Sequence, residues 1–195
     1  MAMPASSTPT TAPRKRVPAA ERRDAIIEAA VSEFARGGLH GTPVDRIARR
    51  VGVAQPYVFS LFGNKRDLFL AAVERGFART AETLERAGRE YLAGRGPEGA
   101  EDIFKAMGAA YVELLETRRD VLMLQHQAYA ACDDEVVRAR VRGLYAGIVG
   151  LVQDLSGGDD ERIDDFLRHG MWLNVAAAMG VEDLSAGCEW MRSYR

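Results

Sequence analysis

Histidine and cysteine are scarce in this chain of 195 residues, which contains three histidines and two cysteines. His40, His126 and His169 are far apart in the sequence, and no two of them have the spacing of metal ligands. Cys132 and Cys188 form no CxxC pair, which favours a reduced compartment and argues against a zinc site. The sequence also contains no phosphate-binding glycine loop and no nucleophile elbow. We therefore expect no metal, no cofactor and no enzymatic activity.

Long apolar runs are missing as well. No stretch approaches the ~18 apolar residues of a membrane-spanning helix, and residues 1–20 lack the apolar segment of a secretory signal. These two absences argue against a membrane partner and predict a cytoplasmic protein. The hydrophobic content of 47% is still sufficient for the core of one or two small domains.

The small net charge of −2 conceals an asymmetry between the two ends of the chain. Residues 1–70 contain 11 Lys or Arg and 6 Asp or Glu, whereas residues 71–195 contain 15 basic and 22 acidic side chains. A basic end beside an acidic body favours contact with a polyanion through that end alone. Chance variation between the two parts of a soluble protein is the competing explanation.

Strand-type alternation is absent, and Ala, Glu, Arg and Leu dominate, as is typical of helices. The pattern predicts an all-α chain of about nine helices. Arg95-Gly96-Pro97 breaks the pattern after the fourth helix, and Ser156-Gly157-Gly158 forms a turn after the seventh. The predicted helices cover residues 19–36, 43–50, 54–62, 65–93, 98–117, 119–131, 133–155, 159–179 and 182–191.

Residues 42–65 form the most informative segment, because they read as two short helices joined by a glycine turn and followed by the start of a third. Thr42 is the expected N-cap of the first short helix, with Pro43 at its first position. Gly52 is expected to end that helix in the left-handed conformation, and Asn64 to cap the long helix that follows. A unit of this size can place its second helix in the major groove of DNA.

The second short helix, residues 54–62, has an outer face that is unusual for a solvated helix. Val58, Leu61 and Phe62 can face inward, which leaves aromatic and polar side chains for the other faces. A solvated helix has little reason to expose aromatic rings, whereas a helix that meets phosphates and base edges has one. The side chains left for the other faces are Gln55, Tyr57, Phe59 and Ser60.

A wider pattern surrounds these helices. It consists of an amphipathic first helix (Ile26, Ile27, Ala30, Val31, Phe34), a break at Gly37-Gly38, and then Thr42-Pro43-Val44, Ile47-Ala48, Val51-Gly52-Val53, Phe59, Phe62, and Lys65 before Asp67-Leu68. In pattern and spacing, residues 21–70 resemble the DNA-binding domain of the TetR family of bacterial transcriptional regulators. The chain departs from the family in carrying Ala54 where many members have a serine cap, and Ser60-Leu61 where His or Tyr is frequent.

The resemblance implies an all-α fold with an N-terminal three-helix helix-turn-helix DNA-binding domain and a C-terminal helical ligand-binding and dimerisation domain. The expected boundaries are residues 1–18 for a disordered basic arm, 19–66 for the DNA-binding domain and 67–195 for the effector-binding and dimerisation domain. The helix at about 65–93 would link the two domains.

The resemblance also implies roles for the outer face of the second short helix. Gln55, Tyr57 and Ser60 are expected to face base edges, and Pro56 to touch a thymine methyl group. The expected partner is double-stranded DNA with a palindromic operator, because a dimer reads two half-sites.

Other residues are expected to hold this helix against the DNA backbone. Thr42, Phe59 and Lys65 have that role, and a phosphate at Lys65 would also meet the free N–H groups of a helix start. The arm of residues 1–18, whose composition predicts disorder, ends in Arg14-Lys15-Arg16. These three residues either follow the phosphates or enter a minor groove, or they belong to a solvated tail.

The last helices are candidates for an interface between two copies. Residues 133–155 carry a broad apolar stripe, and Gly143, Gly147 and Gly150 leave little side-chain bulk beside it. In the TetR family the C-terminal helices pair across a twofold axis, so the resemblance implies a homodimer. Closure of the monomer's own core is the alternative.

The central helices contain larger side chains that could line a cavity for a small molecule, since such sites combine apolar walls with a few polar groups. In the TetR family a cavity of this kind commonly binds an effector that releases DNA. Ordinary core packing is the competing explanation for every candidate. The candidates are Phe104, Met107, Tyr111, Met123, His126, Gln127, Tyr129, Tyr145, Trp172 and Asn174.

The leading hypothesis is a homodimeric, sequence-specific transcriptional regulator, namely a repressor that a small-molecule effector releases from its operator. One alternative is an all-helical small-molecule-binding or scaffold protein without DNA binding, which the missing cap at Ala54 would suit. The other is an activator with the same fold.

Overall fold

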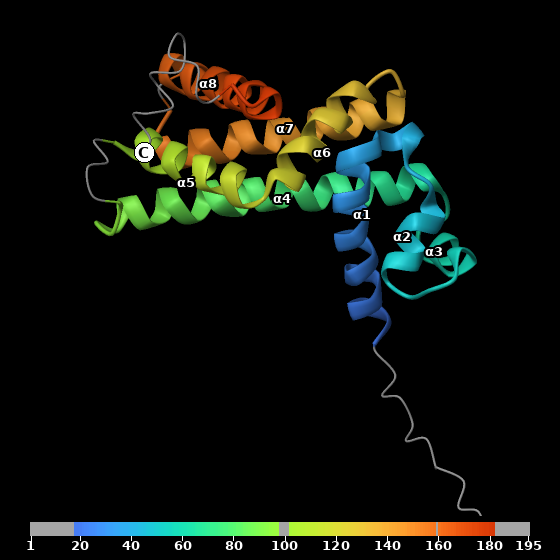
Figure 1. Cartoon of the computed structure of the whole chain (residues 1–195). Helices are drawn as coiled ribbons and strands as arrows, with labels where there is room; N and C mark the ends of the chain where they lie inside the picture. Colours follow the sequence, from blue (N-terminus) through green and yellow to red (C-terminus); the bar gives the residue numbers. More distant parts are fainter. Residues whose placement is uncertain (1–17, 98–101, 159, 182–195) are drawn as a thin grey trace, which may run out of the picture.

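The chain folds into eight helices and no strand within the residues that the structure describes (Figure 1). The structure is a computed structural model and describes residues 18–97, 102–158 and 160–181. The all-α prediction is confirmed, and the ninth predicted helix, residues 182–191, lies outside the described residues. The helices are α1 (Ala19–Gly41), α2 (Val44–Arg50), α3 (Gln55–Phe62), α4 (Lys65–Leu92), α5 (Ile103–Thr117), α6 (Arg119–Ala130), α7 (Glu135–Ser156) and α8 (Asp160–Met179).

Two boundaries differ clearly from the prediction. Helix α1 continues to Gly41 instead of ending near residue 36, but its backbone bends at Gly38, where φ is 62° and only glycine is comfortable. Helix α5 begins at Ile103, five residues later than predicted, because the side chain of Asp102 caps it by accepting the N–H of Lys105 at 2.9 Å.

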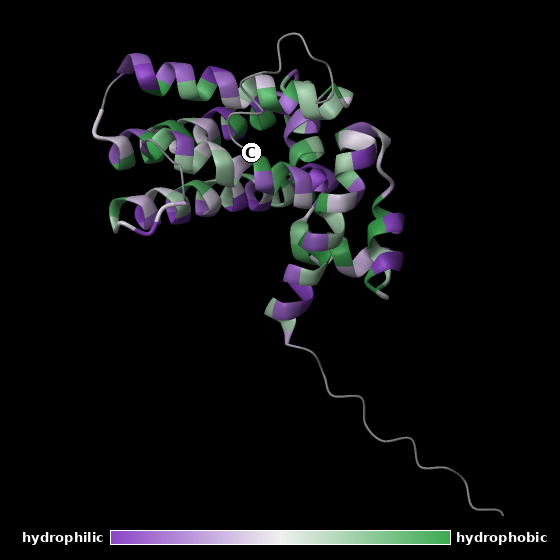
Figure 2. Cartoon of the chain, turned by 60° about the vertical axis from the view of Figure 1, so that its left-hand side comes forward, coloured by the Kyte–Doolittle hydropathy of each residue, from purple (hydrophilic) through white to green (hydrophobic). Residues whose placement is uncertain are grey.

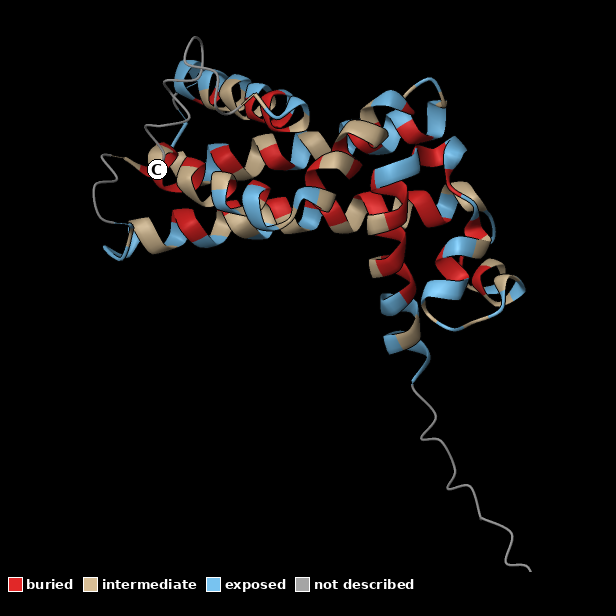
Figure 3. Cartoon of the chain, viewed as in Figure 1, coloured by how far each residue is buried: buried red, intermediate tan, exposed pale blue. Residues whose placement is uncertain are grey.

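Helices α1, α2 and α3 close a small core at one end of the molecule, together with the first turns of α4 (Figure 3). Ile26, Phe34 and Ile47 are fully buried there. The rings of Phe34 and Phe69 meet edge to face with centroids 5.1 Å apart, the arrangement that aromatic quadrupoles favour. This packing sets the angle between the long helix α4 and the short helices.

The turns of this domain follow the predicted chemistry at Gly52 and Asn64. Gly52 has a φ of 69°, in the left-handed region, and the Asn64 side chain accepts the N–H of Asp67 at 2.9 Å. Ala54 is the N-cap of α3 and offers no side-chain bond, although its backbone, with φ −77° and ψ 142°, has the extended conformation of a capping residue.

The predicted capping role of Thr42 is wrong. Pro43 is the N-cap of α2, and the Thr42 hydroxyl donates to the carbonyl of Glu33 at 3.2 Å. The bend in α1 brings the chain back onto that helix, so the Thr42 side chain is turned into the domain and is only 3% exposed.

Helix α4 has 28 residues and runs from the small domain through the body of the molecule (Figure 1). Its buried side chains begin with Leu68 and Phe69 in the small domain and continue to Leu84 and Ala87 between the body helices. Figure 2 shows polar and apolar residues mixed along the helices, as expected for helices with one buried face.

The body consists of α5, α6 and α7 packed around α4, with α8 lying over α5 and α7 (Figure 1). Two ion pairs join α7 to α4, namely Arg66 with Asp134 at 3.1 Å and Arg140 with Glu74 at 2.6 Å. Within the described ranges, no helix combines the length and the apolar character that crossing a membrane requires.

Helix α6 packs along α1 and thereby joins the body to the small domain. The hydroxyl of Ser32 donates to Asp120 at 3.2 Å. At the bend in α1, the carboxamide of Gln127 fills the space that a side chain at Gly38 would need. The positive φ favours glycine at position 38, and a larger residue there would also have to displace the end of the Gln127 side chain.

Candidate nucleic-acid interface and internal cavity

Helix α3 presents one face to its domain and another to the outside. Val58 is fully buried and Phe62 is 7% exposed, as predicted for the inner face. Pro56 and Ser60 are exposed, and Gln55 is half-buried. The predicted reading face is therefore at the surface, at the end of the molecule that Figure 1 shows farthest from α8.

The two aromatic residues of this face are half-buried. The rings of Tyr57 and Phe59 pack partly against the domain core, so each has an anchored side and an accessible side. The hydroxyl of Ser60 donates to the carbonyl of Tyr57 at 2.7 Å, which orients it along its own helix. An anchored aromatic ring loses little conformational freedom when it meets a partner.

Two arginines from the first turns of α1 lie beside α3, and the sequence prediction did not include them. The guanidinium of Arg22 lies 5.9 Å from the centre of the Tyr57 ring, and that of Arg23 lies 4.9 Å from the centre of the Phe62 ring. The sequence feature that could have identified them is the Arg22-Arg23 pair at the start of a predicted helix. They add positive charge next to the exposed face of α3.

Lys65 lies at the start of α4, as predicted, but its ammonium already has a partner. Its Nζ donates to the carbonyl of His40 at 2.9 Å. Burial lowers the pKa of Lys65, because desolvation disfavours the charged form. One hydrogen bond leaves two further N–H donors on the ammonium for a phosphate.

Glu33 is a buried carboxylate that holds α2 against α1. It is 5% exposed and lies 3.0 Å from Arg50, 3.4 Å from Arg36 and 3.8 Å from Arg46. The guanidiniums remain largely exposed, so the charge of the cluster faces solvent on one side. Burial of Thr42 removes that side chain from the predicted backbone contacts, and Arg14-Lys15-Arg16 lies outside the described residues.

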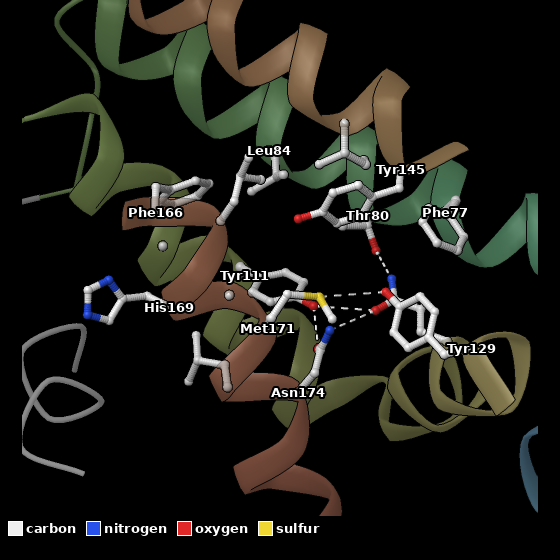
Figure 4. A pocket seen from close by; sticks show the side chains of 16 residues that line it. Phe77, Thr80, Leu84, Tyr111, Tyr129, Tyr145, Phe166, His169, Met171 and Asn174 are labelled. Carbon is white, nitrogen blue, oxygen red and sulfur yellow. Dashed lines mark hydrogen bonds between the residues drawn. The ribbon is translucent and has the colours of Figure 1, made fainter. Parts of the chain in front are cut away.

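A cavity of about 60 Å³ lies between α4, α5, α6, α7 and α8 (Figure 4). Its walls are mainly aromatic and aliphatic, and one side is polar. The lining residues are Phe77, Thr80, Leu84, Gly108, Tyr111, Gln125, Tyr129, Tyr145, Ile148, Phe166, Leu167, His169, Gly170, Met171, Leu173 and Asn174.

The polar side of the cavity is a hydrogen-bonded network that joins four helices (Figure 4). Tyr111 of α5 donates to Asn174 of α8 at 2.5 Å, and Asn174 donates to Gln125 of α6 at 3.2 Å. Gln125 in turn donates to the hydroxyl of Thr80 on α4 at 3.0 Å. Burial raises the pKa of Tyr111 well above its ordinary value, so this hydroxyl stays protonated and remains a donor.

The structure brings together four of the predicted cavity residues, which are Tyr111, Tyr129, Tyr145 and Asn174. Burial, followed by the neighbouring Tyr145, raises the pKa of Tyr129 to about 12. Sequence reasoning missed Thr80 and Gln125, because a polar residue at a buried helix position is recognisable only once its partners are known.

The remaining candidates lie elsewhere. Phe104 packs against Phe166 with ring centroids 5.6 Å apart, and Met107 is fully buried in the core. His126 Nε2 bonds the carbonyl of Asn174 at 2.9 Å from outside the lining, and Gln127 contacts the bend in α1. Met123 is half-buried away from the lining, and Trp172 is 41% exposed on α8.

The part of the chain that the structure describes contains no group of three or more His, Cys, Asp or Glu side chains arranged to hold a metal. Some acidic residues at the starts of helices act as caps. Asp134, for example, caps α7 by accepting the N–H groups of Val136 and Val137.

The small domain coincides with a known family pattern. The model for bacterial regulatory proteins of the tetR family matches residues 26–72, from α1 into the first turns of α4. The N-terminal domain of the chain is thus similar to the DNA-binding domain of the TetR family. Over 50 residues it is 42% identical to the HTH-type transcriptional repressor SCO4008 of Streptomyces coelicolor, and this match covers 26% of each chain. Over 60 residues it is 38% identical to the HTH-type transcriptional activator FasR of Mycolicibacterium smegmatis, which is 31% of this chain and 27% of that one.

The matched segments thus span about a quarter of the length of these two curated relatives. Beyond this domain, the chain resembles solved structures of TetR-family regulators in fold. The solved structure of a TetR-family member from Streptomyces coelicolor, SCO1917, superposes with a TM-score of 0.69 at 18% identity and covers 88% of this chain and 94% of that one.

Proposed function

We propose that this chain is a sequence-specific DNA-binding transcriptional regulator, and that it acts as a repressor which a small molecule releases from its operator. The observation that carries the proposal is the outer face of α3, which is polar and aromatic and lies beside two arginines of α1. Positive charge supplies affinity for the phosphates, and the side chains of α3 supply sequence preference.

The contacts follow from the exposure of each residue. Gln55, Tyr57 and Ser60 read base edges, and Pro56 contacts a thymine methyl group. On the backbone side the contacts come from Phe59 and Lys65, together with the arginines at the start of α1. The basic residues Arg14, Lys15 and Arg16 precede α1 and extend the phosphate contact.

A second copy of the chain covers α7 and α8. Gly143 and Gly147 on α7 face open space. A larger side chain would fit at either position, so packing within the chain does not explain these glycines. Glycine in a helix costs roughly 1 kcal/mol relative to alanine, and close approach of another helix offsets that cost. Trp172, Val175 and Met179 form an exposed apolar line on α8, with exposed fractions of 41%, 39% and 58%.

The cavity is the place where the effector acts. Its lining belongs to five helices, including α4, which leads into the DNA-binding domain, and α6, which contacts α1. A guest changes DNA affinity only if it binds more tightly to the conformation that fits DNA poorly.

Selection of binding sites from random DNA tests the proposal. We expect a palindromic site whose half-sites are spaced to suit two α3 helices, and we expect a complex of two chains per site. The control is a Gln55→Ala, Tyr57→Ala double variant, which should lose the enriched sequence and keep weak non-specific binding. No enrichment by the wild-type chain, or binding by a monomer alone, would contradict the proposal.

An activator is the second candidate, because the relative from Mycolicibacterium smegmatis carries that description. A reporter gene placed behind the selected site separates the two signs of control. Expression that falls when the chain is present supports repression, and expression that rises supports activation.

A further inference from the structure

The chemistry of the cavity restricts the guest to one class of molecule, an inference that rests on the proposed function of the cavity as the effector site. We propose that the cavity takes a planar, uncharged aromatic molecule that carries one carbonyl-type hydrogen-bond acceptor, and that it rejects carboxylates. Four features of the lining lead to this assignment.

Aromatic rings surround the space from several helices. Phe77 comes from α4, Tyr111 from α5, Tyr129 from α6, Tyr145 from α7 and Phe166 from α8 (Figure 4). Rings on several sides offer edge-to-face and offset-stacked contacts to a flat guest, and each such contact contributes beyond the burial of apolar area. A flexible aliphatic chain would lose more conformational freedom for the same contact area.

The lining of the cavity itself has no Lys or Arg side chain to pair with an anionic guest. Among the 16 lining residues none is Lys, Arg, Asp or Glu. His169 points away from the polar network in Figure 4, and its Nδ1 lies 2.8 Å from the carbonyl and 3.2 Å from the carboxylate of Asp165 on its own helix.

Next to the lining on α8 lie the carboxylates of Asp164 and Asp165, and both pair with Arg168. Burial raises the pKa of the Tyr145 hydroxyl, and the carboxylate of Asp164 raises it further. Transfer of a carboxylate from water into such a site is unfavourable, because the cavity lining offers no Lys or Arg side chain to replace its hydration.

The polar network has spare donors. Asn174 Nδ2 donates one hydrogen to Gln125, and Gln125 Nε2 donates one to Thr80. Each amide nitrogen carries a second hydrogen, and neither has a partner among the residues that the structure describes. An acceptor on the guest would satisfy one of them, whereas a pure hydrocarbon would leave both unsatisfied and lose the contact with water.

The cavity alone is too small for such a guest, but three of its side chains separate it from a larger groove. The cavity has only about 60 Å³, but Tyr129, Tyr145 and Met171 also line an open groove of about 550 Å³ on α7. The exposed Arg142 lines this groove but not the cavity that contains the polar network. Small-molecule sites typically measure roughly 300–1,000 Å³. We expect rotation of these three shared side chains to join the two spaces and make room for a two-ring molecule.

Three probes with one ring system test the proposal with the full-length protein. 2-Acetonaphthone is neutral and has a carbonyl acceptor, 2-ethylnaphthalene lacks the acceptor, and 2-naphthoate carries a negative charge. Equilibrium dialysis at pH 7.5 gives the three dissociation constants. We expect the ketone to bind about threefold to tenfold more tightly than the hydrocarbon, in line with one hydrogen bond, and the carboxylate to bind most weakly. Equal or tighter binding of 2-naphthoate overturns the proposal.

A variant series locates the acceptor contact. Asn174→Leu removes one spare donor and should reduce the preference for the ketone over the hydrocarbon, while Tyr91→Phe, a tyrosine outside the cavity lining, should leave it unchanged. Circular dichroism verifies the fold of each variant, and Gln125→Leu replaces Asn174→Leu if the latter does not fold. An unchanged preference in the folded variants overturns the assignment of the acceptor site.

Failure of the effector role gives a different result. If the ketone binds with the expected preferences but does not change affinity for the selected DNA site, the ligand class stands and the release mechanism fails. If the chain binds no DNA at all, the dialysis result is unaffected.

Discussion

Lys65 has two roles in this proposal, because its ammonium both holds the protein together and can contact a DNA phosphate. It joins α4 to the last turn of α1 through the carbonyl of His40. Loss of this side chain therefore removes a positive charge next to α3 and also loosens a contact between two helices.

Lys65→Ala should weaken binding to all DNA sequences alike, because the contact is to phosphate. The slope of log affinity against log salt should decrease by about 1 for each protomer, since one fewer counterion is released. Mobility shifts at several salt concentrations, with the selected site and with a scrambled site, measure both effects. A change confined to the selected site would contradict a phosphate contact.

Tyr57→Ala should alter sequence preference. The ring has one side packed against the domain and one side accessible, so its removal takes away a base contact without emptying the core. Repeated selection from random DNA with this variant should give a different or degenerate consensus. An unchanged consensus would exclude Tyr57 from base recognition.

The helix termini of the DNA-binding domain differ in how well they are capped. Asn64 caps α4 with its side chain, whereas Ala54 holds the conformation of a cap at α3 without the group that completes it. The contribution of a side-chain cap to stability can therefore be tested by removing the cap of α4 and by adding one to α3.

Asn64→Ala should lower the free energy of unfolding by about 1 kcal/mol, and Ala54→Ser should raise it by a similar amount. Urea unfolding followed by circular dichroism measures both changes. Because position 54 is next to the DNA-binding face, the consensus of the Ala54→Ser variant should be determined as well. A loss of stability in Ala54→Ser would show that the start of α3 cannot accept a capping bond.

The junction of α1 and α6 should respond to acid. Burial opposes ionisation of Asp120, but Arg118 and Ser32 outweigh it, so the pKa of Asp120 lies below its ordinary value of 3.8. A carboxyl group with a lowered pKa in the folded state stabilises the fold above its unfolded pKa, and this contribution is lost as the pH falls through the folded pKa.

Asp120→Asn should therefore be less stable than the wild type at pH 6, and the difference should shrink below about pH 4. Urea unfolding at a series of pH values measures the difference. Asp164→Asn, an exposed aspartate of α8 that pairs with Arg168, is the matched control. A difference that stays constant down to pH 3 would assign the effect of Asp120 to packing.

Sequence periodicity was sufficient for the elements of this fold but not for every local detail. The glycine at 52 and the asparagine at 64 are local signals that depend on their own backbone, and both predictions are confirmed. Thr42 failed as a cap because its environment depends on the bend at Gly38, which carries it against Glu33.

The cavity residues also divide into those that the sequence could identify and those that depend on tertiary contacts. Tyr111 and Asn174 were recognisable as polar groups on buried faces, whereas Thr80 and Gln125 acquire meaning only from the contact between α4 and α6. Phe104 and Met107 have the same composition signal as true lining residues but face the core from other sides. Helical periodicity gives the face of a residue and not the neighbour that it meets.

At the scale of the whole molecule, α7 and α8 form the surface that we assign to a second copy. Leu92, at the end of α4, is also an exposed apolar residue, with an exposed fraction of 63%. The same kind of substitution, an exposed apolar residue to Glu, can therefore be compared on α8 and at the end of α4.

Trp172→Glu should convert the dimer to a monomer and weaken binding to the palindromic site strongly, because both half-sites must then be filled independently. Leu92→Glu should leave the dimer and its DNA affinity intact. Sedimentation at micromolar concentration and mobility shifts measure the two properties. A Trp172→Glu chain that remains dimeric would place the interface elsewhere.

The bend in α1 is where α6, a helix of the cavity wall, meets the DNA-binding domain. Gln125 belongs to the cavity wall and Gln127 touches Gly38, and the two glutamines stand two positions apart on a single 12-residue helix. The same helix, α6, packs against α1 over much of its length. We therefore expect a guest that displaces α6 to act on the DNA-binding domain through the bend in α1 as well as through α4.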